Sequence, residues 1–428
     1  MTTMEAPPPA VVEPPDHVDI LLPQGSRILH IGPPKTGTTA LQAAFHLGRT
    51  QTERQGVHYA SHGRHAMSAV LAGIEQPSPW DVERRPPSKL PWNRLVADIR
   101  GSKARRVVLS SEFFADATPE AIKRVVTEIG SEDAQIVVTL RPLARIMPSQ
   151  WQQFVQNQLT VAFDDWVDGV LNRPRGKMTP SFWLRHRHDE LVARWVDVVG
   201  SERLTVVALD DNDRDMVLRV FERLTGLAVG TLVTEPDLSN RSMTVPEIET
   251  VRAFNKSFRD EKLPAPLYSR VMRFGAAAYM RNRQPGPDEA RIELPDWSVE
   301  PIANLAREMM ASIQATGVRI VGNLDLMTQV PAGRAPTQEP VAVSPTVAAS
   351  TAMGVLVASG LARGSLPIIA NESEGIEGDE RPRRAPRPVQ EPPEVLRLST
   401  LQLAVVIFRR GKAALRDRLG TLVFWRRR

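Results

Sequence analysis

The stretch from residue 26 to residue 42, S-R-I-L-H-I-G-P-P-K-T-G-T-T-A-L-Q, constrains the fold of this chain more than any other. A short apolar run ends at Ile31, a Gly-Pro-Pro break follows, and helix-favouring residues begin at Ala40. The pattern predicts a strand, a tight loop and a helix, in that order. Glycine lets successive N–H groups converge on one anion, and a helix N-terminus adds partial positive charge. The sequence therefore predicts an anion-binding loop, to which Lys35 adds a full positive charge.

This loop differs from the usual loop of nucleoside triphosphatases. That pattern, G-x-x-x-x-G-K-[ST], has its lysine directly after the second glycine. Here Lys35 precedes Gly37 by two positions, and Thr38 takes the place of the usual lysine. The hydroxyls of Thr36, Thr38 and Thr39 add hydrogen-bond donors. We expect the five residues from Lys35 to Thr39 to bind one phosphate group jointly.

A second group suited to an anion follows a later strand. The β-branched run from Gln135 to Leu140 is typical of a buried strand, and Pro142 ends it. Arg141 therefore lies at a strand end, where open α/β sheets bind their ligands. Its planar guanidinium grips phosphate oxygens with two hydrogen bonds and keeps its charge. Ser149 follows eight positions later, and we expect it to open the next helix.

The loop at Lys35 and the spacing of Arg141 and Ser149 resemble those of the sulfotransferases that use 3′-phosphoadenosine 5′-phosphosulfate (PAPS). In that family, a P-K-[ST]-G-T-T loop holds the 5′-phosphosulfate end of PAPS. An arginine at a strand end and a serine eight positions later hold the 3′-phosphate. The resemblance covers roughly residues 26–325. It implies a P-loop α/β fold with a parallel central sheet flanked by helices, PAPS as the sulfuryl donor, and no metal.

Two positions depart from the family pattern. Many members have a tryptophan after the two threonines, where it stacks on adenine, whereas this chain has Ala40. The arginine-lysine-glycine segment of the eukaryotic cytosolic enzymes is also absent. Arg281 and Arg283 are weak candidates to complete the 3′-phosphate site, and a solvated turn is the simpler interpretation of that segment.

Strand-like runs alternate with helical ones through the same part of the chain, which predicts parallel strands joined by right-handed crossovers, with helices on both faces. The expected strands are Arg27–Ile31, Val57–Ala60, Val107–Ser110, Ile136–Leu140 and Thr205–Leu209. The expected helices are Thr38–Leu47, Pro119–Ile129, Ser149–Gln158, Phe182–Val199, Arg214–Leu224 and Val245–Phe258. Residues 73–92, rich in proline and tryptophan, predict a loop on the substrate side.

Sulfuryl transfer needs a base for the acceptor hydroxyl and positive charge on the leaving phosphate, and Lys35 can supply that charge. Glu112 follows the expected strand V-V-L-S-S. Sulfotransferases that act on glycans often have a glutamate base near this strand end. The cytosolic sulfotransferases have a histidine near the corresponding strand end. A desolvated glutamate has a raised pKa, which suits a general base. His65 is the rival, since histidine titrates near neutrality.

The remaining histidines predict no special chemistry. His58, His62 and His65 match no standard metal-ligand spacing, and no carboxylates lie nearby in sequence, so we expect no metal. His186 and His188 lie in an arginine-rich helical stretch and are expected at the surface.

Composition divides the chain into four parts. Residues 1–25 are proline-rich and expected to be disordered, and residues 26–328 form the sulfotransferase-like domain. Residues 329–395 read as a proline-rich, largely disordered linker, in which residues 344–361 are able to form a short helix. Residues 396–428 carry nine Lys and Arg against one acid and predict a basic amphipathic helix. This segment thus carries +8 and the rest of the chain −3, which together give the net charge of +5, and we expect no nucleic-acid binding.

Two interpretations of residues 396–428 stay open: a helix that docks on protein, or one that lies on an anionic membrane. The chain has no cysteine, which suits a reducing compartment. We expect no signal peptide and no membrane span. The expected location is the cytoplasm, with peripheral membrane contact as the alternative.

The leading functional hypothesis is transfer of a sulfuryl group from PAPS to a hydroxyl of a carbohydrate or glycolipid. A nucleotide-dependent kinase is the enzyme alternative. It would need magnesium ligands, for which Asp210 and Asp211 are the only acids suitably placed in the sequence. A catalytically inactive binding module with a sulfotransferase-like fold is the alternative from another class.

Overall fold

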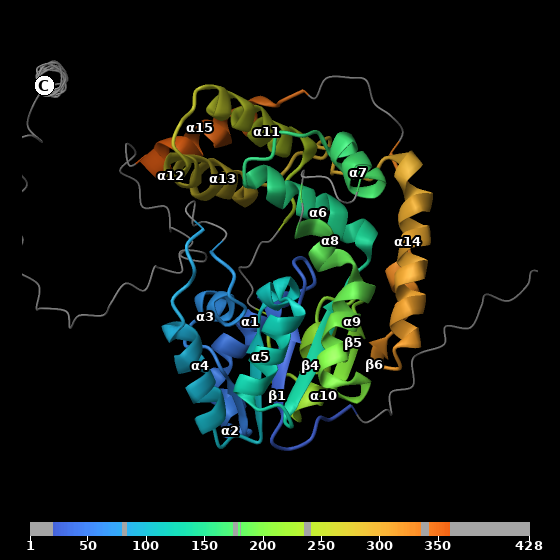
Figure 1. The fold of residues 1–428 in the computed structure, drawn as a ribbon. Helices are drawn as coiled ribbons and strands as arrows, with labels where there is room; N and C mark the ends of the chain where they lie inside the picture. Colours follow the sequence, from blue (N-terminus) through green and yellow to red (C-terminus); the bar gives the residue numbers. More distant parts are fainter. Residues whose placement is uncertain are drawn as a thin grey trace, which may run out of the picture. The chain divides into compact units, whose positions relative to one another are not determined.

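A six-stranded sheet forms the centre of the computed structural model, which describes residues 20–78, 84–173, 179, 181–234, 241–334 and 342–359 of the 428-residue chain (Figure 1). The strand order is β2-β3-β1-β4-β5-β6, and every neighbouring pair is parallel. The strands are β1 (Arg27–Ile31), β2 (Val57–Tyr59), β3 (Arg106–Ser110), β4 (Ala134–Leu140), β5 (Leu204–Ala208) and β6 (Arg319–Gly322). The expected α/β class with a parallel central sheet is confirmed.

Different helices cover the two faces of the sheet. Successive side chains of a strand point to opposite faces, so Ile28 and Leu29 belong to different apolar clusters. Ile28 packs in the cluster that includes α1 (Thr38–Leu47) and α10 (Met216–Thr225). The Leu29 cluster includes residues of α3 (Met67–Gly73), α4 (Leu90–Gly101), α5 (Pro119–Ile129), α9 (His188–Val199) and α14 (Asp296–Ala315). Burial on both faces explains why these strands are continuous apolar runs.

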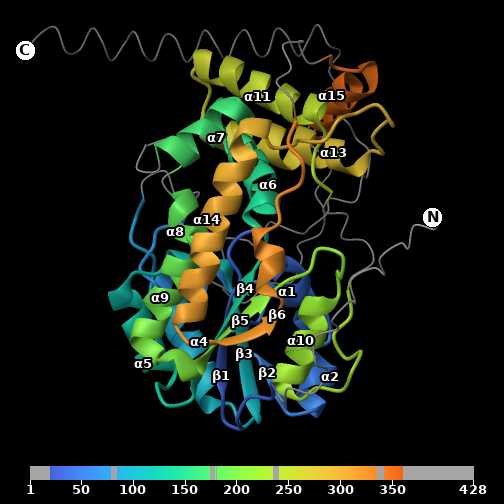
Figure 2. The ribbon, with the colours of Figure 1, turned by 90° about the vertical axis from the view of Figure 1, so that its right-hand side faces the viewer.

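Further helices gather beyond the carboxyl ends of the strands, where Figures 1 and 2 both show α11, α13 and α15. This layer contains α6 (Leu143–Gln156), α7 (Phe163–Asn172), α8 (Ser181–His186), α11 (Val245–Asp260), α12 (Ala265–Tyr268), the π-helix η3 (Ser269–Ala276), α13 (Ala277–Asn282) and α15 (Pro345–Ser359). The short elements are α2 (Arg49–Arg54) and the 3₁₀ turns η1 (Glu112–Asp116), η2 (Ser201–Arg203) and η4 (Leu324–Thr328).

Local capping explains why several helices begin where the sequence predicts. The Thr118 side chain accepts a hydrogen bond from Ala121 N–H, and Pro119 occupies the first turn of α5. At α11, Thr244 and Glu247 form a capping box. The predicted bounds of β1, α1 and α5 are confirmed.

Three predicted elements need correction. Helix α6 begins at Leu143 rather than at Ser149, and Pro148 lies inside it, because burial of residues such as Trp151 outweighs the loss of one N–H donor. The helix expected at Phe182–Val199 is divided at Arg187 into α8 and α9. Trp92, expected in a loop, is buried in α4, and a Cβ on Gly73 would lie 2.6 Å from its ring.

The folded part extends beyond both expected boundaries of the domain. Ile20 and Leu22 are buried, and Arg106 Nε donates to the Leu22 carbonyl at 2.8 Å, so residues 20–25 are not a disordered segment. Helix α15, beyond residue 328, packs on η3 and α13, so this part of the expected linker is folded. Residues 335–341 and 360–428, which include the rest of the linker and the expected basic helix, lie outside the described residues. Within the described ranges, every helix is too short or too polar to cross a lipid bilayer.

Candidate active site

The loop between β1 and α1 is a tight turn with no room for a side chain at Gly32. A Cβ there would lie 1.9 Å from Thr38 Oγ1 and 2.9 Å from a His30 ring carbon. Lys35 and Gly37 both have a left-handed backbone, with φ of 77° and 81°. For a lysine this conformation costs of the order of 1–3 kcal/mol, and such strain clusters at functional sites. The loop is therefore held in an unusual conformation at the predicted anion site.

Two of the three loop threonines support the loop itself. Thr36 donates its hydroxyl proton to the Pro33 carbonyl at 2.8 Å, and Thr38 donates to the Gly32 carbonyl at 3.0 Å. Both side chains are buried, whereas Thr39, in the first turn of α1, is exposed. The expectation that all three hydroxyls face an anion is therefore corrected, and backbone N–H groups and Thr39 are the groups the loop can present.

A chain of hydrogen bonds runs beneath the loop through the three central strands. Ser110 Oγ lies 2.8 Å from His30 Nδ1, Thr139 Oγ1 lies 3.0 Å from His30 Nε2, and Thr36 Oγ1 lies 3.0 Å from Thr139 Oγ1. Since Thr36 donates to a carbonyl, it must accept from Thr139, which in turn accepts from His30 Nε2–H. His30 Nδ1 then accepts from Ser110. Burial lowers the pKa of His30 to about 3, so the ring is neutral.

Lys35 and Arg141, predicted independently from the sequence, meet at the carboxyl ends of β1 and β4. Arg141 Nη1 donates to the Lys35 carbonyl at 3.4 Å. Lys35 Nζ donates to Gln153 Oε1 on α6 at 3.3 Å. Ser149 lies one helical turn before Gln153 and is half-buried, inside α6 rather than at its start. The lysine loop, the arginine and α6 thus line one region of the sheet edge.

Arg141 is engaged by a carboxylate. Its Nε and Nη2 donate to the two oxygens of Asp211 at 2.6 and 3.2 Å. Arg145 lies 3.5 Å from the same carboxylate. Asp211 follows β5, the next strand of the sheet, so the pair joins the ends of β4 and β5. The sequence gives no sign of this partner, which lies 70 positions away.

Glu112 and His65, the two candidate bases, are joined by one glutamine. Gln42 Nε2 donates to the Ser110 carbonyl at 3.0 Å, so its Oε1 must accept from His65 Nδ1–H at 2.5 Å. His65 Nδ1 therefore carries a proton in this arrangement. The Gln42 side chain also hydrogen-bonds to Glu112. Gln42, on α1, was not singled out from the sequence.

The surroundings of Glu112 favour its protonated form. Burial raises the pKa of this carboxyl, and hydrogen bonds from its own backbone N–H and from Gln42 only partly oppose the rise. Arg185 also opposes it, but the arginine is held by Asp116, with Nε and Nη2 each 2.6 Å from a carboxylate oxygen. A raised pKa of this origin suits a carboxylate that takes up a proton.

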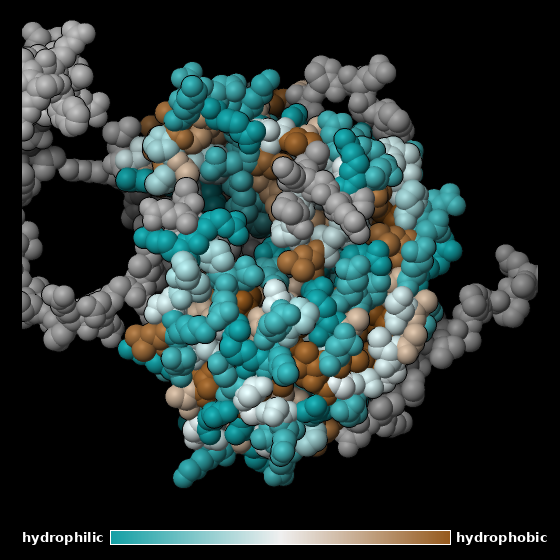
Figure 3. Space-filling model, in the orientation of Figure 1, coloured by the Kyte–Doolittle hydropathy of each residue, from teal (hydrophilic) through white to brown (hydrophobic). Residues whose placement is uncertain are grey.

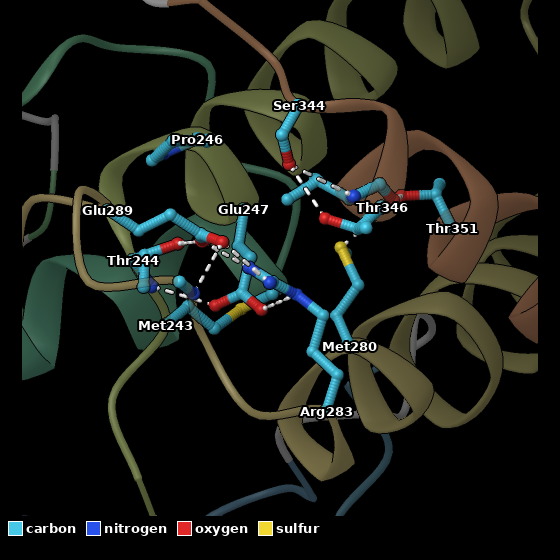
Figure 4. Close-up of polar contacts among 12 residues, drawn as sticks. Met243, Thr244, Pro246, Glu247, Met280, Arg283, Glu289, Ser344, Thr346 and Thr351 are labelled. Atoms are coloured by element: carbon cyan, nitrogen blue, oxygen red, sulfur yellow. Dashed lines mark hydrogen bonds and ion pairs between the residues drawn. The ribbon is translucent and has the colours of Figure 1, made fainter.

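Three other histidine and arginine predictions are corrected. His186 and His188 are buried, not at the surface, and burial lowers the pKa of both, to about 4 for His188. The centroids of the His186 and Phe182 rings lie 4.9 Å apart, and the His188 ring lies beside that of His186. Arg283 is neither a phosphate ligand nor a solvated turn residue: it pairs with the buried Glu247 at 2.7 Å and with Glu289 (Figure 4).

No group of three or more His, Cys, Asp or Glu side chains that could hold a metal ion occurs within the described ranges. Asp211, one of the two acids considered for magnesium, faces Arg141 and Arg145.

Comparison with known proteins finds a distant likeness among solved structures. No protein-family model matches the chain, and no curated protein matches it. Among solved structures, the chain is similar to a sulfotransferase from Alicyclobacillus acidocaldarius, with 19% sequence identity and a TM-score of 0.36. The match covers 57% of this chain and 98% of that one. A TM-score this low leaves the question of function to the residues of the site.

Proposed function

We propose that this protein is a sulfotransferase that moves a sulfuryl group from PAPS to a hydroxyl group of a carbohydrate or glycolipid. The observation that carries the proposal is the 3.4 Å contact between Arg141 and the Lys35 carbonyl. Two elements, each suited to a phosphate group and more than 100 residues apart in sequence, therefore lie within reach of one doubly anionic ligand.

The residues present fit such a donor. The loop offers backbone N–H groups at a helix N-terminus, Lys35 offers an ammonium group, and Arg141 a guanidinium. When bound, PAPS supplies the sulfuryl group and a leaving phosphate. Lys35 is the residue suited to stabilise the negative charge that grows on the leaving oxygen. In our proposal, Lys35, Thr36, Gly37, Thr38 and Thr39 form the 5′ side of the site, with Thr36 and Thr38 acting by holding the loop.

In the same proposal, Arg141 and Ser149 form the 3′ side. The half-buried Ser149 lies on the turn of α6 before Gln153, the partner of Lys35. Arg141 must exchange part of its contact with Asp211 for phosphate oxygens.

We assign the role of general base to Glu112, with His65 as the rival. The raised pKa of Glu112 supports this assignment, because a carboxylate that binds a proton more tightly removes it better from a hydroxyl. Gln42 holds both side chains and acts as a positioning residue. We further propose that residues 396–428 give peripheral contact with a membrane that carries a lipid-linked acceptor; this rests on their nine Lys and Arg against one acid.

Calorimetric titration with 3′-phosphoadenosine 5′-phosphate, the desulfated product of PAPS, tests the proposal. Hydrogen bonds to charged groups contribute about 1.5–3 kcal/mol, so Lys35→Ala and Arg141→Ala should each weaken binding by about tenfold or more. Arg219→Ala, which removes an arginine that pairs with Asp213 on the surface, is the matched control and should bind as the wild type does. Absence of binding by the wild type would refute the proposal, and magnesium-dependent ATP hydrolysis in its place would favour the kinase.

A further inference from the structure

Helix α15 is attached to the domain in a way that is unusual for a protein surrounded by water. It contains no charged residue over Pro345–Ser359. It approaches η3 through small residues: a Cβ on Gly354 would lie 2.5 Å from Ala276 Cα, and one on Gly275 would lie 2.6 Å from Ala358 Cβ. The two helices therefore touch almost backbone to backbone, as small residues permit.

Two of the larger apolar side chains of α15, Met353 and Leu356, are exposed. Met353 is 41% exposed and Leu356 42% exposed, whereas only Val347 and Gly354 of the helix are buried. A helix docked on a water-soluble domain normally turns its large apolar side chains inward and its polar ones outward. Helix α15 departs from this order at Met353 and Leu356, and these two side chains favour an apolar environment.

Neighbouring elements also expose large apolar side chains. Phe274 of η3 is 52% exposed, Leu267 of α12 is 40% exposed, and Leu263, just before α12, is 45% exposed. Figure 3 shows apolar surface beside hydrophilic surface in the part of this face formed by α12 and α15. We call the α12–η3–α15 face the set of Leu263, Leu267, Phe274, Met353 and Leu356.

Basic side chains accompany this face. Arg270 Nε donates to the Ala358 carbonyl at 2.9 Å, which places a cation at the carboxyl end of α15. The Arg273 guanidinium lies 5.3 Å from the centre of the Phe274 ring. Between residues 256 and 281, the basic residues Lys256, Arg259, Lys262, Arg270, Arg273 and Arg281 outnumber the acids Asp260 and Glu261. The charge therefore complements an anionic surface.

We propose that the α12–η3–α15 face binds the surface of an anionic lipid bilayer. Exposed apolar side chains enter the boundary between headgroups and acyl chains, while the arginines contact lipid phosphates. Residues 396–428, later in the sequence, carry an excess of positive charge that is also suited to anionic lipid. The inference concerns the folded domain itself and does not depend on sulfuryl transfer.

The absence of cysteine in the whole chain permits a direct test. In the full-length protein, a single Phe274→Cys substitution is labelled with a polarity-sensitive fluorophore and mixed with vesicles of phosphatidylcholine containing phosphatidylglycerol. We expect a blue shift of the emission. Leu47→Cys is the control: Leu47 is 56% exposed at the end of α1, which returns toward the opposite edge of the sheet. Its label should show no shift.

Co-sedimentation of the unlabelled protein with the same vesicles gives the affinity. Phe274→Glu combined with Leu356→Glu should weaken binding by about tenfold or more, while Leu47→Glu should not. Unchanged melting temperatures show that the variants are folded. Wild-type affinity in the double variant would overturn the proposal, since residues 396–428 alone would then account for binding. Equal binding to pure phosphatidylcholine would overturn the requirement for anionic lipid.

Discussion

Arg141 and Asp211 face each other with both guanidinium–carboxylate contacts made, at 2.6 and 3.2 Å. The pair is partly exposed, with 32% and 25% of the two side chains accessible. An anion that binds Arg141 must compete with this carboxylate. In the function proposed above, Asp211 would therefore lower the affinity of the site for a phosphate group while it keeps the arginine at the ends of β4 and β5.

Removal of the competing charge should strengthen anion binding. Partly exposed ion pairs contribute about 0.2–1 kcal/mol, so Asp211→Asn should tighten the binding of 3′-phosphoadenosine 5′-phosphate by up to about fivefold. Calorimetry at low and physiological salt measures the change. Asp213→Asn removes a nearby carboxylate that pairs with Arg219 instead, and should have no effect. Weaker binding by Asp211→Asn would mean that the carboxylate chiefly orients Arg141.

The proposed base predicts a particular dependence on pH. Glu112 must be deprotonated to accept a proton, so kcat should rise with pH through its raised pKa. Glu112→Gln should lower kcat by about 10²–10⁴-fold and leave product binding unchanged. His65→Asn should leave the shape of the pH profile intact. If His65→Asn instead abolishes the acidic limb while Glu112→Gln keeps it, the histidine is the base.

The raised pKa of Glu112 also predicts how the free energy of unfolding depends on pH. Because its pKa is raised in the folded protein, the folded state binds more protons than the unfolded state between the ordinary glutamate pKa, about 4.3, and the raised one. Glu112 makes its full contribution to the free energy of unfolding at pH values below the ordinary glutamate pKa. This contribution is lost as the pH rises through the raised pKa of the folded protein. The free energy of unfolding of wild type minus that of Glu112→Gln, measured in urea, should therefore fall as pH rises through this window.

The buried histidines should instead lower the free energy of unfolding as the pH falls. The pKa of His188 is lowered to about 4 by burial, so the unfolded chain takes up the proton first as pH falls below about 6.5. As the pH falls from about 6.5 to about 4, the free energy of unfolding should decrease by an amount of the order of 1–3 kcal/mol. His188→Leu should flatten this slope in urea titrations at pH 4.5–7. An unchanged slope would show that His188 does not remain neutral in the folded protein.

The parts of the site that depend on local sequence were predictable. Gly-Pro-Pro after Ile31 and helix formers after Gly37 fix β1, the loop and α1, and Pro142 fixes the end of β4 beside Arg141. Since parallel strands end at one edge of the sheet, the meeting of the loop with Arg141 follows from these local patterns.

The remaining parts depend on contacts between distant segments. His30 looks like one member of an apolar strand, and only the neighbouring strands supply Ser110 and Thr139 as its partners. In the sequence, Gln42 is an ordinary helix residue, and only the packing of α1 beside β3 brings it to the Ser110 carbonyl. His186 follows Arg185 in a polar-looking stretch, yet the segment turns the histidine inward and pairs the arginine with Asp116. Arg283 likewise finds Glu247 only through the folding of α11.

The ring of His30 lies beneath the lysine loop, and its charge stays constant over a wide range of pH. With a pKa of about 3, it carries no charge in mildly acidic, neutral or alkaline solution. Its hydrogen bonds therefore keep one direction, from Ser110 toward the Pro33 carbonyl, from mildly acidic to alkaline solution. If the lysine loop binds a phosphoryl compound as proposed, protonation of His30 should contribute nothing to the pH dependence of that binding.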